Sequence, residues 1–93
     1  MDSEKLNQDQ IADALAKVEG WEIQDDFITK EYEFDDFQTA LAFVNTVGEI
    51  AETTDHHPDI MFGWGYAEIA ITSHEAGGLT AQDFDLAAKI DNL

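Results

Sequence analysis

The stretch IMFGWGYAEIAITS, residues 60–73, decides the fold. It predicts two strands, 60–64 and 67–73, because apolar residues are dense on both sides of a glycine-containing turn. We expect the turn at Gly65-Tyr66, since glycine at the first central position suits a type II′ turn. Strands joined by so short a turn pair antiparallel, so the pattern predicts an antiparallel sheet.

A second pair of strands is predicted upstream of this hairpin. The first is Trp21-Glu22-Ile23, and the second covers residues 28–34, where apolar and polar side chains alternate. The two are joined at Asp25-Asp26, a dipeptide that favours a turn. The sheet is therefore expected to have four strands.

Three helices are predicted around these strands. The first covers residues 7–18, with Asn7 as N-cap and Gly20 as stop signal. The last begins with the near capping box at residues 80–83. Between them a longer helix begins at Asp35 or Asp36. Its apolar residues form one stripe: Phe37, Ala40, Leu41, Val44, Val47, Gly48 and Ala51. Phe43 and Ile50 lie on a neighbouring face, where they either widen the core or meet a second subunit.

The order of these elements, α-β-β-α-β-β-α, predicts the fold class. We expect one α+β domain over residues 1–93, with a four-stranded antiparallel sheet and three helices on one face. A chain of 93 residues and 10.4 kDa leaves room for one core only. The chain has no internal repeat and no low-complexity linker that would divide it.

The charge of the chain narrows its partners. It has 21 acidic residues against four lysines and no arginine, a net charge of −17. Nucleic acids and anionic membrane surfaces need clustered Lys and Arg, so neither is expected as a partner. The lack of cysteine excludes disulfides and thiolate chemistry. Residues 1–5 show no secretory leader, and no apolar run approaches the roughly 18 residues of a membrane span, so we expect a cytoplasmic protein.

The acidic residues are dispersed along the chain rather than gathered in a tail. A dispersed coat of carboxylates suits concentrated salt, where the Debye length falls to about 3 Å at roughly 1 M and repulsion is screened. We interpret the coat as an adaptation to a salt-rich host. An ordinary acidic protein that tolerates its own repulsion is the alternative.

The three histidines of the chain are the candidate chemical groups. His56 and His57 follow the long helix, and His74 follows the second strand of the 60–73 hairpin. Because that hairpin is antiparallel, both points lie at the same end of the sheet, so the three imidazoles are expected to converge. Histidine titrates near neutral pH, which suits general acid and base catalysis.

Two other interpretations of the histidines stay open at this point. Each could be a cap, a surface residue or a hydrogen-bonded core group. They could also bind zinc, for which imidazole is a common ligand. Adjacent residues in an extended segment point in opposite directions, which disfavours His56 and His57 as ligands of one ion.

The sequence resembles the pterin-4a-carbinolamine dehydratases. The resemblance rests on ETTDHHP at residues 52–58, then five residues to Trp64, nine to His74 and eight to Asp83. Gly20-Trp21, FDDF at residues 34–37 and HEAGGLT at residues 74–80 are also similar to that family. The match covers nearly the whole chain.

The resemblance implies a reaction and a site. The reaction is the dehydration of 4a-hydroxytetrahydrobiopterin to quinonoid dihydropterin, which supports pterin recycling for aromatic amino acid hydroxylation and needs no metal or organic cofactor. It implies His56, His57 and His74 as the catalytic site, with His56 and His74 as acid and base and His57 chiefly positioning the substrate. The pocket residues implied are Asp55, His56, His57, Thr72, Ser73, His74 and Glu75. A homodimer or homotetramer is expected as well.

Four other residues carry more ordinary expectations. Asp83 is best explained as a helix cap, and Trp21 and Trp64 as core or pocket wall. Glu52, one turn before His56, either hydrogen-bonds an imidazole or lies exposed. A non-catalytic pterin-binding module, for example in molybdopterin metabolism, and a protein-interaction adaptor are the alternative functions.

The charge leads to a prediction about salt. At low ionic strength nearly every carboxylate repels the others, and this repulsion opposes the compact state. We expect the melting temperature and the activity to rise together as KCl increases from about 0.05 M to about 2 M. Thermal melts across a KCl series measure this. A melting temperature that stays flat or falls would contradict the salt adaptation and leave the family resemblance untouched.

Overall fold

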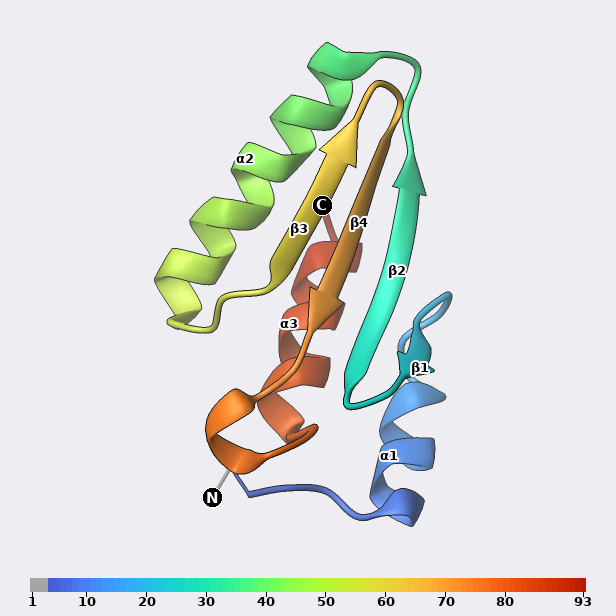
Figure 1. The fold of residues 1–93 in the computed structure, drawn as a ribbon, viewed down its shortest axis with the longest axis vertical. Coiled ribbons are helices and arrows are strands. Elements are labelled where there is room, and N and C mark those ends of the chain that lie inside the picture. Colours follow the sequence, from blue (N-terminus) through green and yellow to red (C-terminus); the bar gives the residue numbers. More distant parts are fainter. Residues whose placement is uncertain (1–3) are drawn as a thin grey trace.

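In the computed structural model, which describes residues 4–93, strand β4 (Tyr66–Ile71) lies inside a four-stranded sheet (Figure 1). It pairs antiparallel with β2 (Phe27–Glu33) on one side and with β3 (Asp59–Gly63) on the other. The short strand β1 (Glu22–Gln24) extends the sheet beyond β2, giving the order β1-β2-β4-β3. The predicted four-stranded antiparallel sheet is confirmed.

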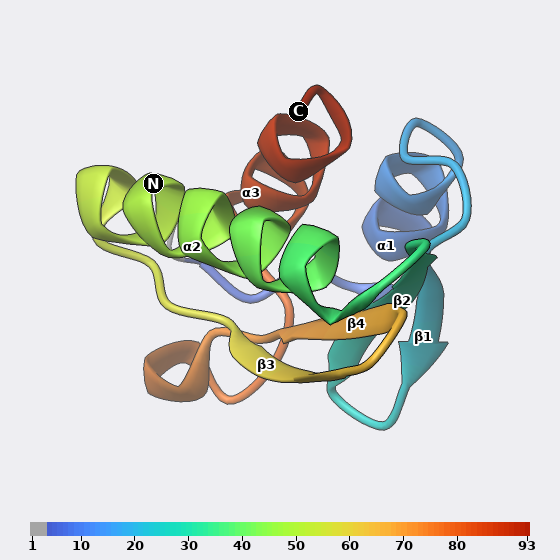
Figure 2. The same ribbon diagram turned by 90° about the horizontal axis from the view of Figure 1, so that it is seen from above.

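Three α-helices cover one face of this sheet (Figure 2). They are α1 (Gln8–Leu15), α2 (Phe37–Thr54) and α3 (Ala81–Asp91), and a short 3₁₀ turn, η1 (His74–Ala76), follows β4. Their order in residues 4–93 is the predicted α-β-β-α-β-β-α, with η1 as the one addition. The predicted fold class, with its helices on one face, is confirmed.

The predicted caps begin the helices. The side chain of Asn7 accepts a hydrogen bond from the backbone N–H of Gln10 at 2.9 Å, and Gln10 accepts one from the N–H of Asn7 in return. Helix α2 is capped by Asp36, not Asp35, because the Asp36 carboxylate accepts from the N–H of Thr39 at 2.8 Å.

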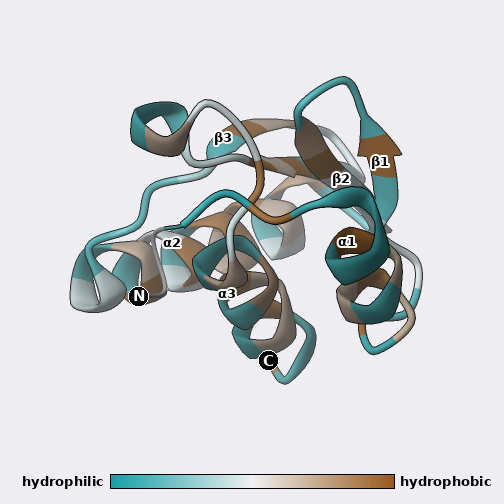
Figure 3. Ribbon diagram, turned by 90° about the horizontal axis from the view of Figure 1, so that it is seen from below, coloured by the Kyte–Doolittle hydropathy of each residue, from teal (hydrophilic) through white to brown (hydrophobic). Residues whose placement is uncertain are grey.

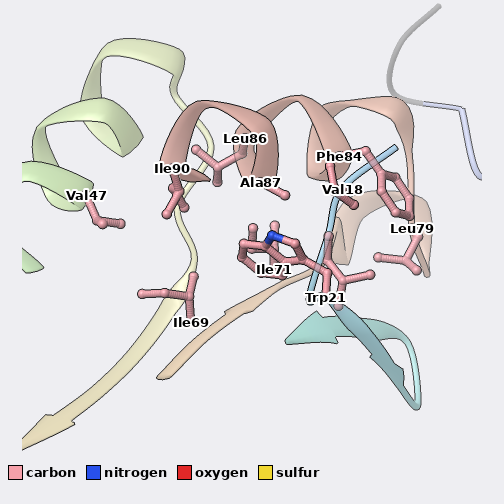
Figure 4. Close-up of a cluster of buried hydrophobic side chains, with 11 residues drawn as sticks. Val18, Trp21, Val47, Ile69, Ile71, Leu79, Phe84, Leu86, Ala87 and Ile90 are labelled. Atoms are coloured by element: carbon pink, nitrogen blue, oxygen red, sulfur yellow. The ribbon is translucent and has the colours of Figure 1, made fainter. Parts of the chain in front are cut away.

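The core lies between the sheet and α2 and α3 (Figure 4). Strand β4 contributes every second residue to it, as a half-buried strand must. The core members with no more than 2% exposure include Ile28, Ile69 and Ile71 from the sheet and Val47, Leu86 and Ile90 from the helices. Figure 3 colours the chain by hydropathy. Hydrophobic brown segments lie on the strands, and hydrophilic teal runs along the N-terminal segment and the link from α2 to β3.

The hairpin turn is displaced by one residue from its predicted position. Gly63 pairs with Tyr66, so the two central residues are Trp64 and Gly65. Gly65 has a φ of +86°, and glycine at the second central position is typical of a type II turn. Tyr66 belongs to β4, because it pairs with Glu33 of β2 and with Gly63 of β3. Trp64 is 72% exposed at this turn, so the expectation that it lies in the core or the pocket wall is wrong; Trp21, at 4%, is buried as expected.

Only part of the apolar stripe of α2 is buried. Ala40, Val47 and Ala51 are buried, and Phe43 and Ile50, on the neighbouring face, pack against the core. Phe37 and Leu41 remain 44% and 37% exposed. The Phe37 ring stacks on Phe62 of β3, with ring centroids 5.4 Å apart.

The end of α3 is fixed by the carboxylate of Asp91. It accepts hydrogen bonds from Trp21 Nε1 at 2.9 Å, Lys30 Nζ at 2.8 Å and Tyr32 OH at 2.6 Å. Burial opposes ionisation of Asp91, but the bonds from Lys30, Tyr32 and Trp21 outweigh it and hold its pKa below the usual value. Burial and the Asp91 carboxylate both raise the pKa of Tyr32.

None of the helices within residues 4–93 is long and apolar enough to cross a membrane. Residues 1–3 lie outside the described residues. The first three residues of the predicted 1–93 domain therefore lie outside the described part. The same holds for the first three of residues 1–5, where we expect no secretory leader.

The exposed apolar residues Phe37 and Leu41 of α2 and the free edge of β3 lead to a prediction about assembly. Unpaired strand edges and exposed apolar faces favour association, so we expect a particle of at least twice the 10.4 kDa monomer mass. Light scattering at micromolar concentration in about 2 M KCl measures it. Leu41→Glu should lower the mass, and Asn45→Glu, which adds the same charge at an exposed polar position of α2, serves as control. A monomeric parent protein would remove this prediction.

Candidate active site

Two connecting segments meet at one end of the sheet. Residues 55–58 link α2 to β3, and residues 72–80 link β4 to α3. Because Asp59 lies opposite Ala70 in the antiparallel β3–β4 pair, the start of β3 is beside the end of β4. Both segments lie at the lower end of the sheet in Figure 1.

The two segments enclose a pocket of about 530 Å³. This volume is in the range of small-molecule sites. Its lining residues are Asp55, His56, His57, Thr72, Ser73, His74, Glu75, Ala76 and Gln82. All seven residues singled out from the sequence are among them. Ala76 and Gln82 are the two that the sequence reasoning missed.

The end of α2 sends His56 and His57 in different directions. Asp55 ends the helix in the left-handed region at φ +55°, a conformation that Asp tolerates better than most residues. The N–H of His56 then donates to the carbonyl of Ala51 at 3.1 Å. The side chain of His56 is 15% exposed, whereas that of His57 is 55% exposed. One imidazole therefore belongs to the interior wall and the other to the rim.

A buried carboxylate orients the imidazole of His56. Asp83 has no exposed surface, and its Oδ1 lies 2.5 Å from His56 Nε2. The same carboxylate accepts hydrogen bonds from Ser73 Oγ at 2.9 Å and from the N–H of Thr80 at 2.8 Å. Because a carboxylate only accepts, Nε2 of His56 carries a proton, so in the neutral ring Nδ1 keeps its lone pair.

Asp83 thus does more than the sequence reasoning expected. It caps α3 as predicted, since Thr80 and Asp83 form a capping box. Its contact with His56 was missed, because a cap three residues after Thr80 explains an aspartate fully without a second partner. The sequence feature that could have indicated this contact is the place of Asp83, eight residues beyond His74, in the pattern that carries the family resemblance.

Glu52 pairs with the imidazole of His57. Its Oε2 lies 2.5 Å from Nε2 of His57, and both side chains are exposed. The bond to an imidazole and the exposure considered for Glu52 are therefore both confirmed, whereas His56 pairs with Asp83. Glu52 therefore acts on the rim of the pocket.

His74 is placed by an aromatic contact rather than a hydrogen bond. The ring of Phe27 meets it edge to face, with centroids 6.0 Å apart and planes at 77°. The β1–β2 turn that precedes Phe27 is held nearby, because Thr72 Oγ1 donates to the carbonyl of Asp26 at 2.5 Å. The sequence pattern gave no sign that this turn approaches the histidines.

Within residues 4–93, no group of three or more His, Cys, Asp or Glu side chains is arranged to hold a metal ion. The imidazoles of His56 and His57 instead pair with one carboxylate each.

Comparison with known proteins identifies the family of this pocket. The family model described as pterin 4 alpha carbinolamine dehydratase matches residues 4–93. The chain belongs to this family. The resemblance stated from the sequence is thereby confirmed.

Two relatives illustrate the extent of the match with the dehydratase family. A protein of Rubrobacter xylanophilus, assigned the name pterin-4-alpha-carbinolamine dehydratase, is 45% identical over 89 residues that cover 95% of this chain and 83% of the relative. A protein of Thermomicrobium roseum, assigned the same name, is 43% identical over 89 residues. The match covers 96% of this chain and 96% of the relative.

Solved structures show the same fold. A crystal structure described as a transcriptional coactivator/pterin dehydratase from Brucella melitensis has a TM-score of 0.91 at 28% identity, covering 96% of this chain and 97% of that one. A pterin dehydratase-like RuBisCO assembly factor of the alpha-carboxysome has a TM-score of 0.63 at 23% identity, covering 77% and 83%. The second shares the fold alone.

The contact between Asp83 and His56 leads to a prediction. Asp83→Asn keeps the shape of the side chain but removes the carboxylate that fixes the tautomer of His56. We expect the rate of carbinolamine dehydration to fall by roughly 10- to 100-fold, the usual effect of removing a partner that orients an active group. Stopped-flow kinetics measure it.

Asp36→Asn is the matched control, because it removes a capping carboxylate from α2, away from the histidines. It should change the free energy of unfolding little, because Asn caps a helix about as well as Asp, and it should leave the rate unchanged. A folded Asp83→Asn protein with the parental rate would show that Asp83 is a cap and nothing more.

Proposed function

We propose that this protein dehydrates 4a-hydroxytetrahydrobiopterin to quinonoid dihydropterin and water by histidine acid and base catalysis. The observation that carries the proposal is the position of His56, His57 and His74 around one pocket in a chain of the carbinolamine dehydratase family. We place this reaction in the cytoplasm, in the recycling of the pterin used by aromatic amino acid hydroxylation.

The reaction is an elimination across two ring atoms. The bond between C4a and its hydroxyl oxygen breaks, and a proton given to that oxygen releases it as water. The proton on N5 leaves to a base, and the N5 electrons form the new C4a=N5 double bond. One acid and one base that titrate near neutrality are enough, and the solvent restores both afterwards.

His56 is the better placed base. Its Nε2 donates to Asp83, so the lone pair of Nδ1 is available to accept the N5 proton. The Asp83 carboxylate faces the imidazolium that forms, which keeps the ring oriented through the transfer.

His74 is the better placed acid. Its side chain is exposed in the pocket and forms no hydrogen bond with other groups in residues 4–93, so it can carry a proton to the 4a-hydroxyl. The edge of Phe27 limits the rotation of its ring.

The remaining pocket residues bind the pterin. Asp55 and Glu75 supply carboxylates that can accept from the 2-amino group and N3–H of the ring. The hydroxyls of Thr72 and Ser73 donate to protein partners, so they face the pocket as acceptors. His57, paired with Glu52 on the rim, positions the substrate.

Removal of the histidines tests the proposal. His56→Ala and His74→Ala should each lower the rate of dehydration of synthetic carbinolamine by roughly 10²-fold or more, the usual contribution of one acid or base. His57→Ala is the matched control: it should chiefly raise KM. The assay is repeated after exhaustive chelation, which should leave all rates unchanged.

Parental activity in His74→Ala would refute the assigned roles. A wild-type protein that binds dihydropterin but does not accelerate dehydration would instead favour the alternative of a non-catalytic pterin-binding module. Activity lost on chelation and restored by zinc would point to a metal.

A further inference from the structure

Gln82 lines the pocket but has no role in the reaction as proposed above. It is the second residue of α3, where its N–H donates to Thr80 Oγ1 at 3.2 Å. The carboxylate of the next residue, Asp83, lies 2.5 Å from the imidazole of His56. The start of α3, at the lower end of the sheet in Figure 1, therefore places Gln82 beside the proposed base.

The other side-chain donors of the pocket are already occupied. The hydroxyl of Thr72 donates to a backbone carbonyl, and that of Ser73 donates to the buried carboxylate at the start of α3. The Nε2–H groups of His56 and His57 each donate to a carboxylate of the protein. In the proposed reaction, the proton of His74 goes to the departing hydroxyl. None of these protons is left to hold an acceptor atom of the substrate ring.

The side-chain amide of Gln82 is the donor that remains. Gln82 is exposed, and its amide makes no hydrogen bond with another group in residues 4–93. The ionised carboxyl groups of Asp55 and Glu75 can only accept, and no lysine lines the pocket. An acceptor atom of a ligand in this pocket therefore finds its side-chain donor at Gln82.

The pterin ring has such an acceptor beside its reacting atoms. C4 carries a carbonyl oxygen and is bonded to C4a, which in turn is bonded to N5. The carbonyl oxygen on C4 therefore projects along the same edge of the fused rings as N5. When N5 faces His56, this oxygen faces the adjoining part of the pocket wall, where Gln82 lies.

We propose that Gln82 is a specificity-determining residue, which selects a 4-oxo pterin by donating a hydrogen bond from its amide to the C4 carbonyl oxygen. The inference rests on the proposed function, because N5 at His56 sets the orientation of the ring. Asp55 and Glu75 serve the donors of the ring and cannot serve this oxygen. An ammonium at this position would oppose protonation of His56, whereas a neutral amide does not.

The test measures the binding of two compounds that differ in the group on C4. One is 6-methyl-7,8-dihydropterin, which has the C4 carbonyl. The other is 2,4-diamino-6-methyl-7,8-dihydropteridine, which has an amino group in its place. Neither carries a hydroxylated side chain, so the ring alone is compared. In Gln82→Met we expect Kd of the 4-oxo compound to rise about threefold to tenfold, as for loss of one neutral hydrogen bond. Titration calorimetry measures both Kd values.

Gln82→Glu replaces the donor by an acceptor of the same shape. Its carboxylate repels the C4 carbonyl oxygen but accepts from a 4-amino group. The preference for the 4-oxo compound should therefore fall by more than about tenfold. Gln38→Glu is the matched control, because Gln38 is also the second residue of its helix, is exposed, and does not line the pocket. It should leave both Kd values unchanged.

Three results would overturn the proposal. The first is a parental Kd for the 4-oxo compound in a folded Gln82→Met protein. The second is an equal change of both Kd values in Gln82→Glu, which would report a general effect of charge. The third is an equal effect of Gln82→Glu and Gln38→Glu.

Failure of this inference is distinguishable from failure of the proposed function. Turnover of the 6-methyl carbinolamine by the parent protein, with unchanged selectivity in Gln82→Glu, refutes the role of Gln82 alone. Loss of the 4-oxo preference in Gln82→Glu, with no turnover by the parent protein, refutes the catalysis and supports the role of Gln82. Binding of neither compound to the parent protein refutes both.

Discussion

The site depends on one buried carboxylate. Asp83 is fully removed from solvent, and isolation of such a charge is unfavourable unless every lone pair finds a donor. The donors come from three places: the backbone of Thr80 starts α3, the hydroxyl of Ser73 follows β4, and the imidazole of His56 follows α2. The hydrogen bonds that satisfy the Asp83 carboxylate therefore require the two connecting segments and α3 to meet. The same contacts that satisfy the charge build the pocket wall and fix the tautomer of His56.

Helix α3 is fixed at both ends by carboxylates. Asp83 joins its first turn to the pocket, and Asp91 joins its last turn to Trp21, Lys30 and Tyr32. Between them Leu86, Ala87 and Ile90 pack into the core. The helix consequently has little freedom to rotate or slide relative to the sheet. This rigidity benefits acid and base chemistry, because proton transfer needs heavy atoms within hydrogen-bond reach of the substrate.

Local sequence patterns predicted the secondary-structure elements but not the contacts between segments that are distant in sequence. The N-cap at Asn7, the period-two strands and the antiparallel hairpin each depend on neighbours in sequence, so the fold class and the meeting of three histidines followed. The turn at Trp64-Gly65 was misplaced because either glycine-containing pair fits a tight turn, and only the pairing of Gly63 with Tyr66 decides between them. The His56–Asp83 and His74–Phe27 contacts join distant segments, and no periodicity reports them.

The scarcity of lysine shapes the electrostatics of the pocket. Of the four lysines, Lys30 is committed to Asp91, and none lines the pocket with Asp55 and Glu75. Imidazoles are therefore the groups there that can become positive, beside the carboxyl groups of Asp55 and Glu75. A pterin carbinolamine has no net charge, so the acidic coat does not repel it at a distance. In the binding mode proposed above, its amide and amino hydrogens face acceptors and its hydroxyl faces an imidazole. A strongly acidic surface is therefore compatible with the proposed reaction, because the substrate is neutral and the elimination of water requires the protein only to donate one proton and accept another.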